Sequence, residues 1–325
     1  MPRPARPTRP DEPARNDQPT RPDQPDRSDQ PDRSDQPDRS DQPDRSDQPD
    51  QTGPTDQPGR TAPSDRPVLL VAGASSGIGA AVAARGTDGG ARVAVCARRA
   101  GALRAVADAC GATPYVADVT VRGEVDELVA AVVRDHGRLD GVVANAGTIR
   151  PGGLLDLSDE DWDATLRTNL TSVFLLARAA LPHLAAARGA FVTVGSVAGL
   201  RAAAGASAYA ASKAGAGMLT SVIAAEFGPH GVRANTVCPG WTRTEMADEE
   251  MREFTGGLSL DAAYAQATVL VPQRRAAAAE EVADAVLWLL GPRSSYVNGA
   301  TLTVDGGLTS VDAGRVPFDF HVTPR

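Results

Sequence analysis

The sequence has few of the residues that build metal sites and disulfide frameworks. It contains three cysteines and four histidines in 325 residues. The cysteines, Cys96, Cys110 and Cys238, are odd in number and far apart, with neither metal-ligand spacing nor a paired framework. We therefore predict no bound metal, and free thiols fit a reducing cytosol.

Strongly basic clusters and long apolar runs are also lacking. The formal net charge is −8, and the pairs Arg98–Arg99 and Arg274–Arg275 stand alone, so no basic face is available for nucleic-acid phosphates. The first residues form no apolar signal segment. No stretch reaches the roughly 18 apolar residues that a membrane span needs. We expect a cytoplasmic protein without nucleic-acid or membrane partners.

Residues 1–66 hold most of the prolines and almost no large apolar side chains. Between Arg21 and Asp50 they repeat the unit Ser-Asp-Gln-Pro-Asp-Arg, as in 28–33. Proline in every unit blocks a helix, and there is too little apolar area to offset the conformational entropy of folding. We expect a disordered tail. A solubilising spacer, a docking tether, a tandem-repeat expansion and a start site assigned too early all remain open.

After Arg66, short apolar runs alternate with helical patterns. The runs predict strands at 68–72, 91–96, 113–116, 141–144, 191–195, 233–237 and 300–304. The helical patterns lie at 78–84, 103–110, 124–135, 159–184, 209–227 and 279–290. This alternation predicts one α/β domain at 67–310, a Rossmann-type doubly wound parallel sheet of about seven strands.

Two segments fall outside the alternation. Residues 242–278 are predicted to form a substrate lid over the carboxyl ends of the strands, where such sheets bind ligands. The lid's large apolar residues fit either an apolar pocket wall or ordinary helix packing; they are Met246, Met251, Phe254 and Tyr264, beside Trp241. Residues 311–325 form a C-terminal extension.

The first strand runs directly into a glycine-rich turn that opens the first helix. The turn reads Gly73-Ala-Ser-Ser-Gly77-Ile-Gly79. Glycine suits a tight turn and the close approach of backbone to a ligand. The helix amino terminus behind the turn offers free N–H groups and the positive end of the helix dipole to a pyrophosphate. Strand, turn and helix together predict a dinucleotide site.

Further motifs follow in order along the chain. They are Asn145-Ala146-Gly147, then Ser196 ahead of Tyr209-Ala-Ala-Ser-Lys213, and then Pro239-Gly240. Together with the Gly-x-x-x-Gly-x-Gly spacing, this pattern resembles the short-chain dehydrogenase/reductase family over residues 67–308, and 3-oxoacyl-thioester reductases within it. Ala72 stands where the family usually carries Thr, and Gly86 where a large apolar residue is usual. The resemblance implies an oxidoreductase that moves a hydride between NAD(P) and a carbonyl or alcohol.

The resemblance also implies which residues hold the cofactor. They are Gly73, Ser75, Ser76, Gly77, Ile78, Gly79, Asp118, Val119, Asn145, Ala146, Gly147, Tyr209, Lys213, Pro239, Gly240 and either Thr242 or Thr244. The second strand is followed by Arg98 and Arg99 and by no acid, which favours the 2′-phosphate of NADP(H) over the 2′-hydroxyl of NAD(H). Exposure of both arginines at a plain loop remains the alternative.

Tyr209 and Lys213 lie four residues apart on one helix, so their side chains share a face. Hydride transfer to a carbonyl requires a proton donor, and a nearby ammonium together with the oxidised cofactor is expected to lower the pKa of the tyrosine. By resemblance Ser196 bonds the substrate oxygen, Lys213 holds the nicotinamide ribose, and Asn169 links Lys213 to solvent through water. Asn169 as a helix-bending structural residue is the alternative.

Two other readings of the chain remain open. One is an NAD-preferring sugar, steroid or secondary-alcohol dehydrogenase, and another is a non-catalytic dinucleotide sensor of redox state. The sequence does not identify the small-molecule substrate. The small residues of the Tyr209 helix allow close packing, and in the family that helix forms a subunit interface, which implies a homotetramer or homodimer.

Overall fold

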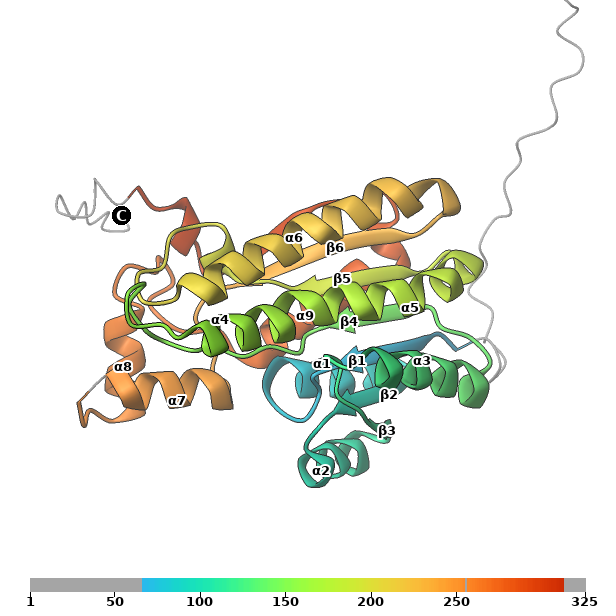
Figure 1. The fold of residues 1–325 in the computed structure, drawn as a ribbon, viewed down its shortest axis with the longest axis horizontal. Helices are drawn as coiled ribbons and strands as arrows, with labels where there is room; N and C mark the ends of the chain where they lie inside the picture. The colour runs from blue at the N-terminus through green and yellow to red at the C-terminus, as the bar shows by residue number, and fades with distance from the viewer. Residues whose placement is uncertain (1–65, 255, 313–325) are drawn as a thin grey trace, which may run out of the picture. The chain divides into compact units, whose positions relative to one another are not determined.

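The computed structural model describes residues 66–254 and 256–312 and places a seven-stranded sheet at their centre (Figure 1). All strand pairs are parallel, and the order is β3-β2-β1-β4-β5-β6-β7. The strands are β1 Val68–Ala72, β2 Arg92–Ala97, β3 Thr113–Val116, β4 Gly141–Ala144, β5 Ala190–Val194, β6 Arg233–Pro239 and β7 Thr301–Val304. The predicted doubly wound parallel sheet is confirmed.

Helices cover both faces of the sheet. They are α1 Gly77–Asp88, α2 Ala100–Cys110, α3 Arg122–His136, α4 Asp159–Leu166, α5 Ser172–Ala187, α6 Ser207–Phe227, α7 Glu245–Phe254, α8 Leu260–Ala267 and α9 Ala279–Leu290. Helices α3, α5 and α6 lie in front of the sheet in Figure 1, and α1 and α9 lie behind it. This layering follows from the crossovers between successive parallel strands, which require a helix on one face or the other.

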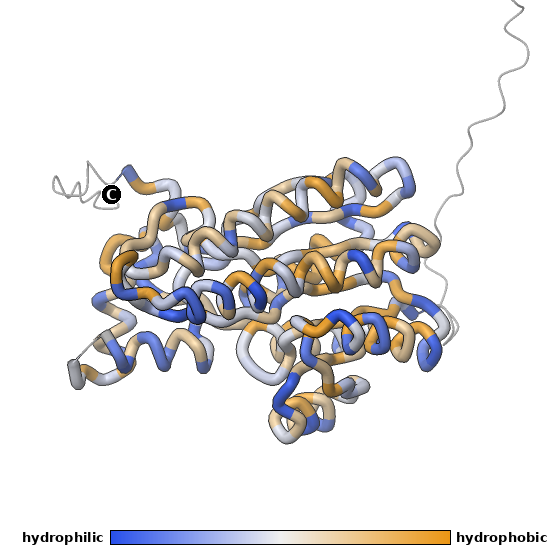
Figure 2. The backbone as a smooth tube through the Cα atoms, viewed as in Figure 1, coloured by the Kyte–Doolittle hydropathy of each residue, from blue (hydrophilic) through white to orange (hydrophobic). Residues whose placement is uncertain are grey.

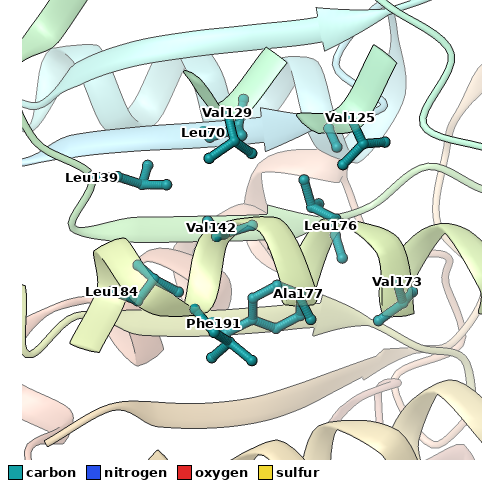
Figure 3. Close-up of a cluster of buried hydrophobic side chains, with 14 of the residues drawn as sticks. Leu70, Val125, Val129, Leu139, Val142, Val173, Leu176, Ala177, Leu184 and Phe191 are labelled. Carbon is teal, nitrogen blue, oxygen red and sulfur yellow. The ribbon is translucent and has the colours of Figure 1, made fainter. Parts of the chain in front are cut away.

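Each face has its own apolar core. The core under α3, α5 and α6 is shown in Figure 3, where Leu176 and Ala177 of α5 lie over Val142 and Phe191 of the sheet. The opposite core packs α1, α2 and α9 against alternate residues of the same strands, such as Val71. All five residues of β1 are buried. The apolar segments of Figure 2 accordingly run through the strands and the inner faces of the helices.

Gly86 has a packing reason for replacing a larger residue. A Cβ added there would lie 3.2 Å from Val93, 3.6 Å from Leu69 and 3.7 Å from Leu287. Glycine costs about 1 kcal/mol of helix propensity relative to alanine. The missing side chain instead lets α1 approach both the sheet and α9 closely.

The long helix predicted at 159–184 is interrupted. It divides into α4 and α5, joined by one π-helical turn over Arg167–Thr171, and Asn169 lies in that turn. A π turn inserts one extra residue into the helix and is frequent at functional sites. The hydrophobic period on either side of Asn169 contains no signal of the insertion, so the sequence pattern alone reads as one helix.

This stretch, Asp159–Ala187, is long and apolar enough to cross a membrane by length and composition, contrary to the expectation that no segment qualifies. In the structure it is a core helix. Leu176, Ala180 and Leu184 are fully or almost fully buried between α3, α6 and the sheet. The hydropathy of the inner face of the segment is therefore explained by packing inside the domain, whereas Phe174 on its outer face is exposed.

The lid interval contains α7 and α8, which the sequence pattern did not predict as helices. The predicted tail lies outside the described residues except for Arg66, and so does the extension except for residues 311–312.

Candidate active site

The strand order reverses between β1 and β4, and there the glycine turn and the Asn145-Ala146-Gly147 segment meet. Gly73 has φ +76°, and a Cβ on it would lie 2.6 Å from the Cα of Ala146. A Cβ on Gly79 would collide with the carbonyl oxygen of Gly73. Side chains are excluded from both positions, so the two segments approach each other closely at the carboxyl edge of the sheet, and we call the space above this crossing point the groove.

Asn145 locks this crossing point. Its Nδ2 donates to the carbonyl of Gly73 at 2.7 Å, and its backbone N–H donates to the carbonyl of Ala72 at 3.2 Å. Helix α1 begins at Gly77, and the side chain of its N-cap residue, Ser76, makes no cap hydrogen bond. The first turn of α1 is therefore available to an anion, and the groove fits the pyrophosphate of a dinucleotide.

The loop after β2 carries two arginines with different partners. Nη1 of Arg98 lies 3.7 Å from the carboxylate of Asp118. Burial raises the pKa of Asp118, but its bonds from Thr120 and the charge of Arg98 outweigh burial and leave the pKa below its usual value. Val119 is buried behind Asp118. These residues border the side of the groove where β2 and β3 end.

Ser196 and Tyr209 meet at the other end of the groove. Ser196 follows β5, and its Oγ accepts from the N–H of Ala198 at 3.1 Å, which fixes the side chain. Tyr209, in the first turn of α6, is hydrogen-bonded to Ser196. The two predicted catalytic hydroxyl groups are thus brought together.

The protein groups around Tyr209 raise its pKa. The expected lowering by the ammonium together with the oxidised cofactor stays a prediction. Burial is the largest cause; the bond to Ser196 acts in the opposite direction, and Glu250 and Cys238 raise the pKa further. The loss of hydration destabilises the phenolate by more than the hydrogen bond from Ser196 stabilises it. In the protein alone, Tyr209 is a protonated acid at neutral pH.

Lys213 lies behind Tyr209 and is the only lysine of the chain. Its Nζ is 5.7 Å from the centroid of the Tyr209 ring and donates to the carbonyl of Val194 at 2.8 Å. Burial lowers the pKa of Lys213 to about 8, and the neighbouring Cys238 thiol acts weakly in the opposite direction. A lysine held in this way is close to losing its proton in mildly alkaline solution.

Asn169 is buried and fixed by three bonds. Its Oδ1 accepts from the N–H of Thr148 at 2.8 Å, while Nδ2 donates to the Thr148 carbonyl at 2.9 Å and to Ser212 at 3.0 Å. A Cβ on Gly147 would lie 3.4 Å from Nζ of Lys213 and 3.5 Å from Oδ1 of Asn169. Both polar groups thus border Gly147. The link from Asn169 through water to Lys213 remains a prediction.

The lid begins on the glycine turn. A Cβ on Gly77 would lie 3.1 Å from Cγ2 of Thr244, whereas the hydroxyl of Thr242 donates back to the carbonyl of Gly240 at 3.1 Å. Of the two threonine candidates, Thr244 therefore faces the groove. Pro239 ends β6, and Gly240 packs against the backbone of Asp305.

Helices α7 and α8 share a small core of their own. Met251 and Tyr264 are buried in it, and Trp241 packs against it. The hydroxyl of Tyr264 donates to Asp248 at 2.8 Å, and the guanidinium of Arg243 lies 4.2 Å from the Tyr264 ring centroid. Of the two alternatives for Met251 and Tyr264, ordinary helix packing is confirmed, because both side chains are buried between α7 and α8.

Comparison with known proteins places this geometry in a family. The family model described as enoyl-(acyl carrier protein) reductase matches residues 73–309. Protein MoaE of Klebsiella aerogenes is 40% identical over 257 residues, covering 77% of this chain and 98% of that protein. The 3-oxoacyl-[acyl-carrier-protein] reductase FabG of Thermotoga maritima is 36% identical, covering 74% and 97%. The chain belongs to the short-chain dehydrogenase/reductase family.

Solved structures of other family members agree. The crystal structure of an actinorhodin polyketide ketoreductase with NADPH superposes with a TM-score of 0.73, at 35% identity over 76% of this chain and 99% of the other. Levodione reductase gives a TM-score of 0.73 at 30% identity, with coverages of 76% and 98%. The chain is therefore an oxidoreductase that transfers hydride between a nicotinamide dinucleotide and a carbonyl or secondary alcohol.

Sequence reasoning missed three residues of this family member's site. Glu245 and Glu250 lie on α7 within the lid, where no family motif points to them. Cys238 is buried beside Ser196 and Lys213, and the electrostatic coupling of its thiol to Lys213 is seen only in the folded chain. The helical spacing of the residues in α7 could have indicated which face of the helix points inward, but only if the helix itself had been predicted from the sequence.

Glu250 offers a test of the electrostatics around Tyr209. Its carboxylate raises the pKa of Tyr209 and is itself partly buried. Alcohol oxidation needs tyrosinate, so Glu250→Gln is expected to shift the rise of the oxidation rate to lower pH, because a negative charge near the phenolate is removed. The measurement is kcat/KM for oxidation as a function of pH.

The matched control for this test is Glu249→Gln, a change of the same charge at an exposed position on the same helix. Its profile should overlay that of the unmodified protein. A Glu250→Gln profile that stays in place, or shifts to higher pH, would show that Glu250 does not act on Tyr209.

Proposed function

We propose that the chain reduces a ketone or 3-oxoacyl-thioester carbonyl with NADPH, and that Tyr209 delivers the proton. The observation that carries the proposal is the hydrogen bond between Ser196 and a partly buried Tyr209, with Lys213 fixed behind the ring. Two hydroxyl groups converge on one point at the carboxyl edge of the sheet. A carbonyl oxygen placed there accepts from both.

Ser196, Tyr209 and Lys213 have separate roles in the proposed reduction. Ser196 orients the substrate oxygen, and the Tyr209 hydroxyl transfers its proton to that oxygen as negative charge develops on it. Lys213 stabilises the tyrosinate that results, until solvent returns the proton. Because the pKa of Tyr209 is raised, it is protonated at neutral pH, as an acid for the reductive direction must be.

The glycine turn, the open first turn of α1 and the crossing at Asn145 fit a dinucleotide. When bound, the nicotinamide supplies or accepts the hydride. Gly73, Ser75, Ser76, Gly77, Ile78 and Gly79 would hold the pyrophosphate side. Asn145, Ala146, Gly147, Tyr209, Lys213, Pro239, Gly240 and Thr244 would hold the nicotinamide side, and Asp118 and Val119 the adenine.

The proposed preference for NADPH rests on Arg98 and Arg99, since a guanidinium binds a phosphate more strongly than it binds a hydroxyl. We expect Arg98→Ala combined with Arg99→Ala to lower kcat/KM for NADPH about tenfold or more while changing that for NADH little. The measurement is carbonyl reduction with a panel of ketones and 3-oxoacyl thioesters, with each cofactor. Arg104→Ala, on α2, is the matched charge control.

An equal loss with both cofactors would show that the arginines do not read the 2′-phosphate. A panel in which no carbonyl is reduced with either cofactor would overturn the proposed substrate class.

We also infer a homotetramer or homodimer through the outer face of α5 and α6. Ala211, Ala214, Met218 and Val222 are exposed along one side of α6, and Phe174 of α5 is 44% exposed. Large apolar side chains gathered on two adjacent helices suit contact with a second copy. Other small residues of α6 pack within the chain: Ala216 is buried, and Gly215 lies against Leu170.

A cytoplasmic location and the division into tail, domain 67–310 and extension are part of the same proposal.

A further inference from the structure

One nitrogen of Arg99 lies within hydrogen-bond distance of three oxygens. Nη2 lies 3.2 Å from Oγ of Ser75, 3.0 Å from Oγ of Ser76 and 2.8 Å from Oε2 of Glu245. Ser75 and Ser76 belong to the glycine turn, and Arg99 precedes α2. A guanidinium and two serine hydroxyls that meet at one point form a subsite for an anion. In this structure the anion is a carboxylate of the chain itself.

Glu245 reaches this subsite from the lid. It is the first residue of α7 and directly follows Thr244, whose side chain lies against Gly77 of the turn. The Arg99–Glu245 pair therefore joins the loop after β2 to the start of the lid, next to the phosphate-binding turn. The pair holds both groups in their charged forms: Arg99 and Ser76 lower the pKa of Glu245, and Glu245 raises that of Arg99.

The donors that Glu245 uses are those proposed for the cofactor. The preference for NADPH requires Arg99 to face the 2′-phosphate, and the serines lie beside it. A carboxylate and a phosphate dianion cannot both lie against one guanidinium without strong repulsion, because their like charges would be only a few ångströms apart. NAD(H), which carries a 2′-hydroxyl there, does not create this conflict.

We propose that Glu245 occupies the 2′-phosphate subsite as an internal competitor and so sets how strongly the enzyme discriminates between NADP(H) and NAD(H). The inference rests on the proposed role of Arg99. Binding of NADP(H) must displace Glu245 from Arg99 and thereby detach the start of α7 from the adenosine side of the groove. NAD(H) binds with the pair intact.

Glu245→Gln tests the competition, because it keeps the size of the side chain and removes the charge. The probes are 2′,5′-ADP and 5′-AMP, which differ in the 2′-phosphate, and binding is measured by titration calorimetry at low salt. Exposed ion pairs are weak, so we expect 2′,5′-ADP to bind about two- to fivefold more tightly to the variant. Binding of 5′-AMP should be unchanged. Glu253→Gln, an exposed acid further along α7, is the matched control and should alter neither affinity.

A double-mutant cycle with Arg99→Gln separates this inference from the proposed cofactor site. In the Arg99→Gln background, Glu245→Gln should have no effect on 2′,5′-ADP. If Arg99→Gln weakens 2′,5′-ADP but Glu245→Gln alone leaves it unchanged, or tightens both probes equally, the competition is refuted and the NADP site stands. If Arg99→Gln does not change the preference for 2′,5′-ADP, the proposed NADP site fails, and the competition fails with it.

Discussion

Tyr209→Phe is expected to reduce turnover by a factor of about 10²–10⁴, the range in which a positioned acid or base contributes. The variant keeps the ring and loses only the hydroxyl that bonds to Ser196. The glycine turn and Asn145 are untouched, so cofactor affinity should remain within about twofold. The measurement pairs steady-state reduction rates with cofactor binding followed by fluorescence.

Tyr115→Phe is the matched control for this prediction. Tyr115 lies on the edge strand β3, and its hydroxyl donates to Asp135 of α3 at 2.9 Å, with no bond to Ser196 or Lys213 among the described residues. Its turnover should be close to that of the unmodified protein. A Tyr209→Phe variant of near-normal rate would refute the proposed proton donor. A variant that no longer binds cofactor would show that the hydroxyl is needed for binding, so that lost turnover could not be assigned to proton transfer.

Lys213→Met is expected to abolish most of the activity while making the fold more stable. Burial lowers the pKa of Lys213 to about 8 from 10.5, which means that the folded chain holds an ammonium in an unfavourable place. Each pKa unit corresponds to about 1.4 kcal/mol, so we expect a gain of roughly 1–3 kcal/mol in the free energy of unfolding at pH 7. Thermal and urea unfolding measure the gain.

The pH dependence of stability is a second test of whether the Lys213 ammonium lowers the free energy of unfolding. Between pH 8 and 10.5 the unfolded chain binds this proton more often than the folded chain does, so lysine makes the free energy of unfolding rise with pH in that window. Lys213→Met should lack the rise. Lys213→Arg, which cannot lose its charge, should be less stable than the unmodified protein.

The titration itself is directly observable because the chain has one lysine. Growth with ¹³C-labelled lysine labels a single residue, and its Cε chemical shift reports protonation of Nζ. A midpoint near pH 8 is expected. A midpoint above 10, or a Lys213→Met variant that unfolds more easily at pH 7, would contradict the buried, strained ammonium.

Much of this molecule could be predicted from local patterns. The apolar run Val68–Ala72, the glycine turn and the pair Tyr209–Lys213 predict their elements because each is specified by neighbours in sequence. The order of strands and helices then restricts the sheet to a parallel, doubly wound arrangement. The reaction class follows from motifs that recur in fixed order along the chain.

The features that could not be predicted from the sequence depend on contacts between segments far apart in the chain. The π-helical turn at Asn169 follows from bonds to Thr148 and Ser212, which no helical period reveals. The raised pKa of Tyr209 in the protein alone was not predicted, because the sequence indicated a nearby ammonium but not the extent of burial. The lid helices were not predicted because their small core forms only when α7 and α8 meet.

The sequence by itself determined the fold class and the reaction class, and it supplied the candidate residues for the dinucleotide site and for proton transfer, since each depends on short-range spacing of residues with distinctive chemistry. Only the tertiary structure decided that burial raises the pKa of Tyr209 and lowers that of Lys213, and that Glu245 lies on Arg99. Those properties are set by burial and by charge separation across the fold, and both depend on which distant segments come into contact.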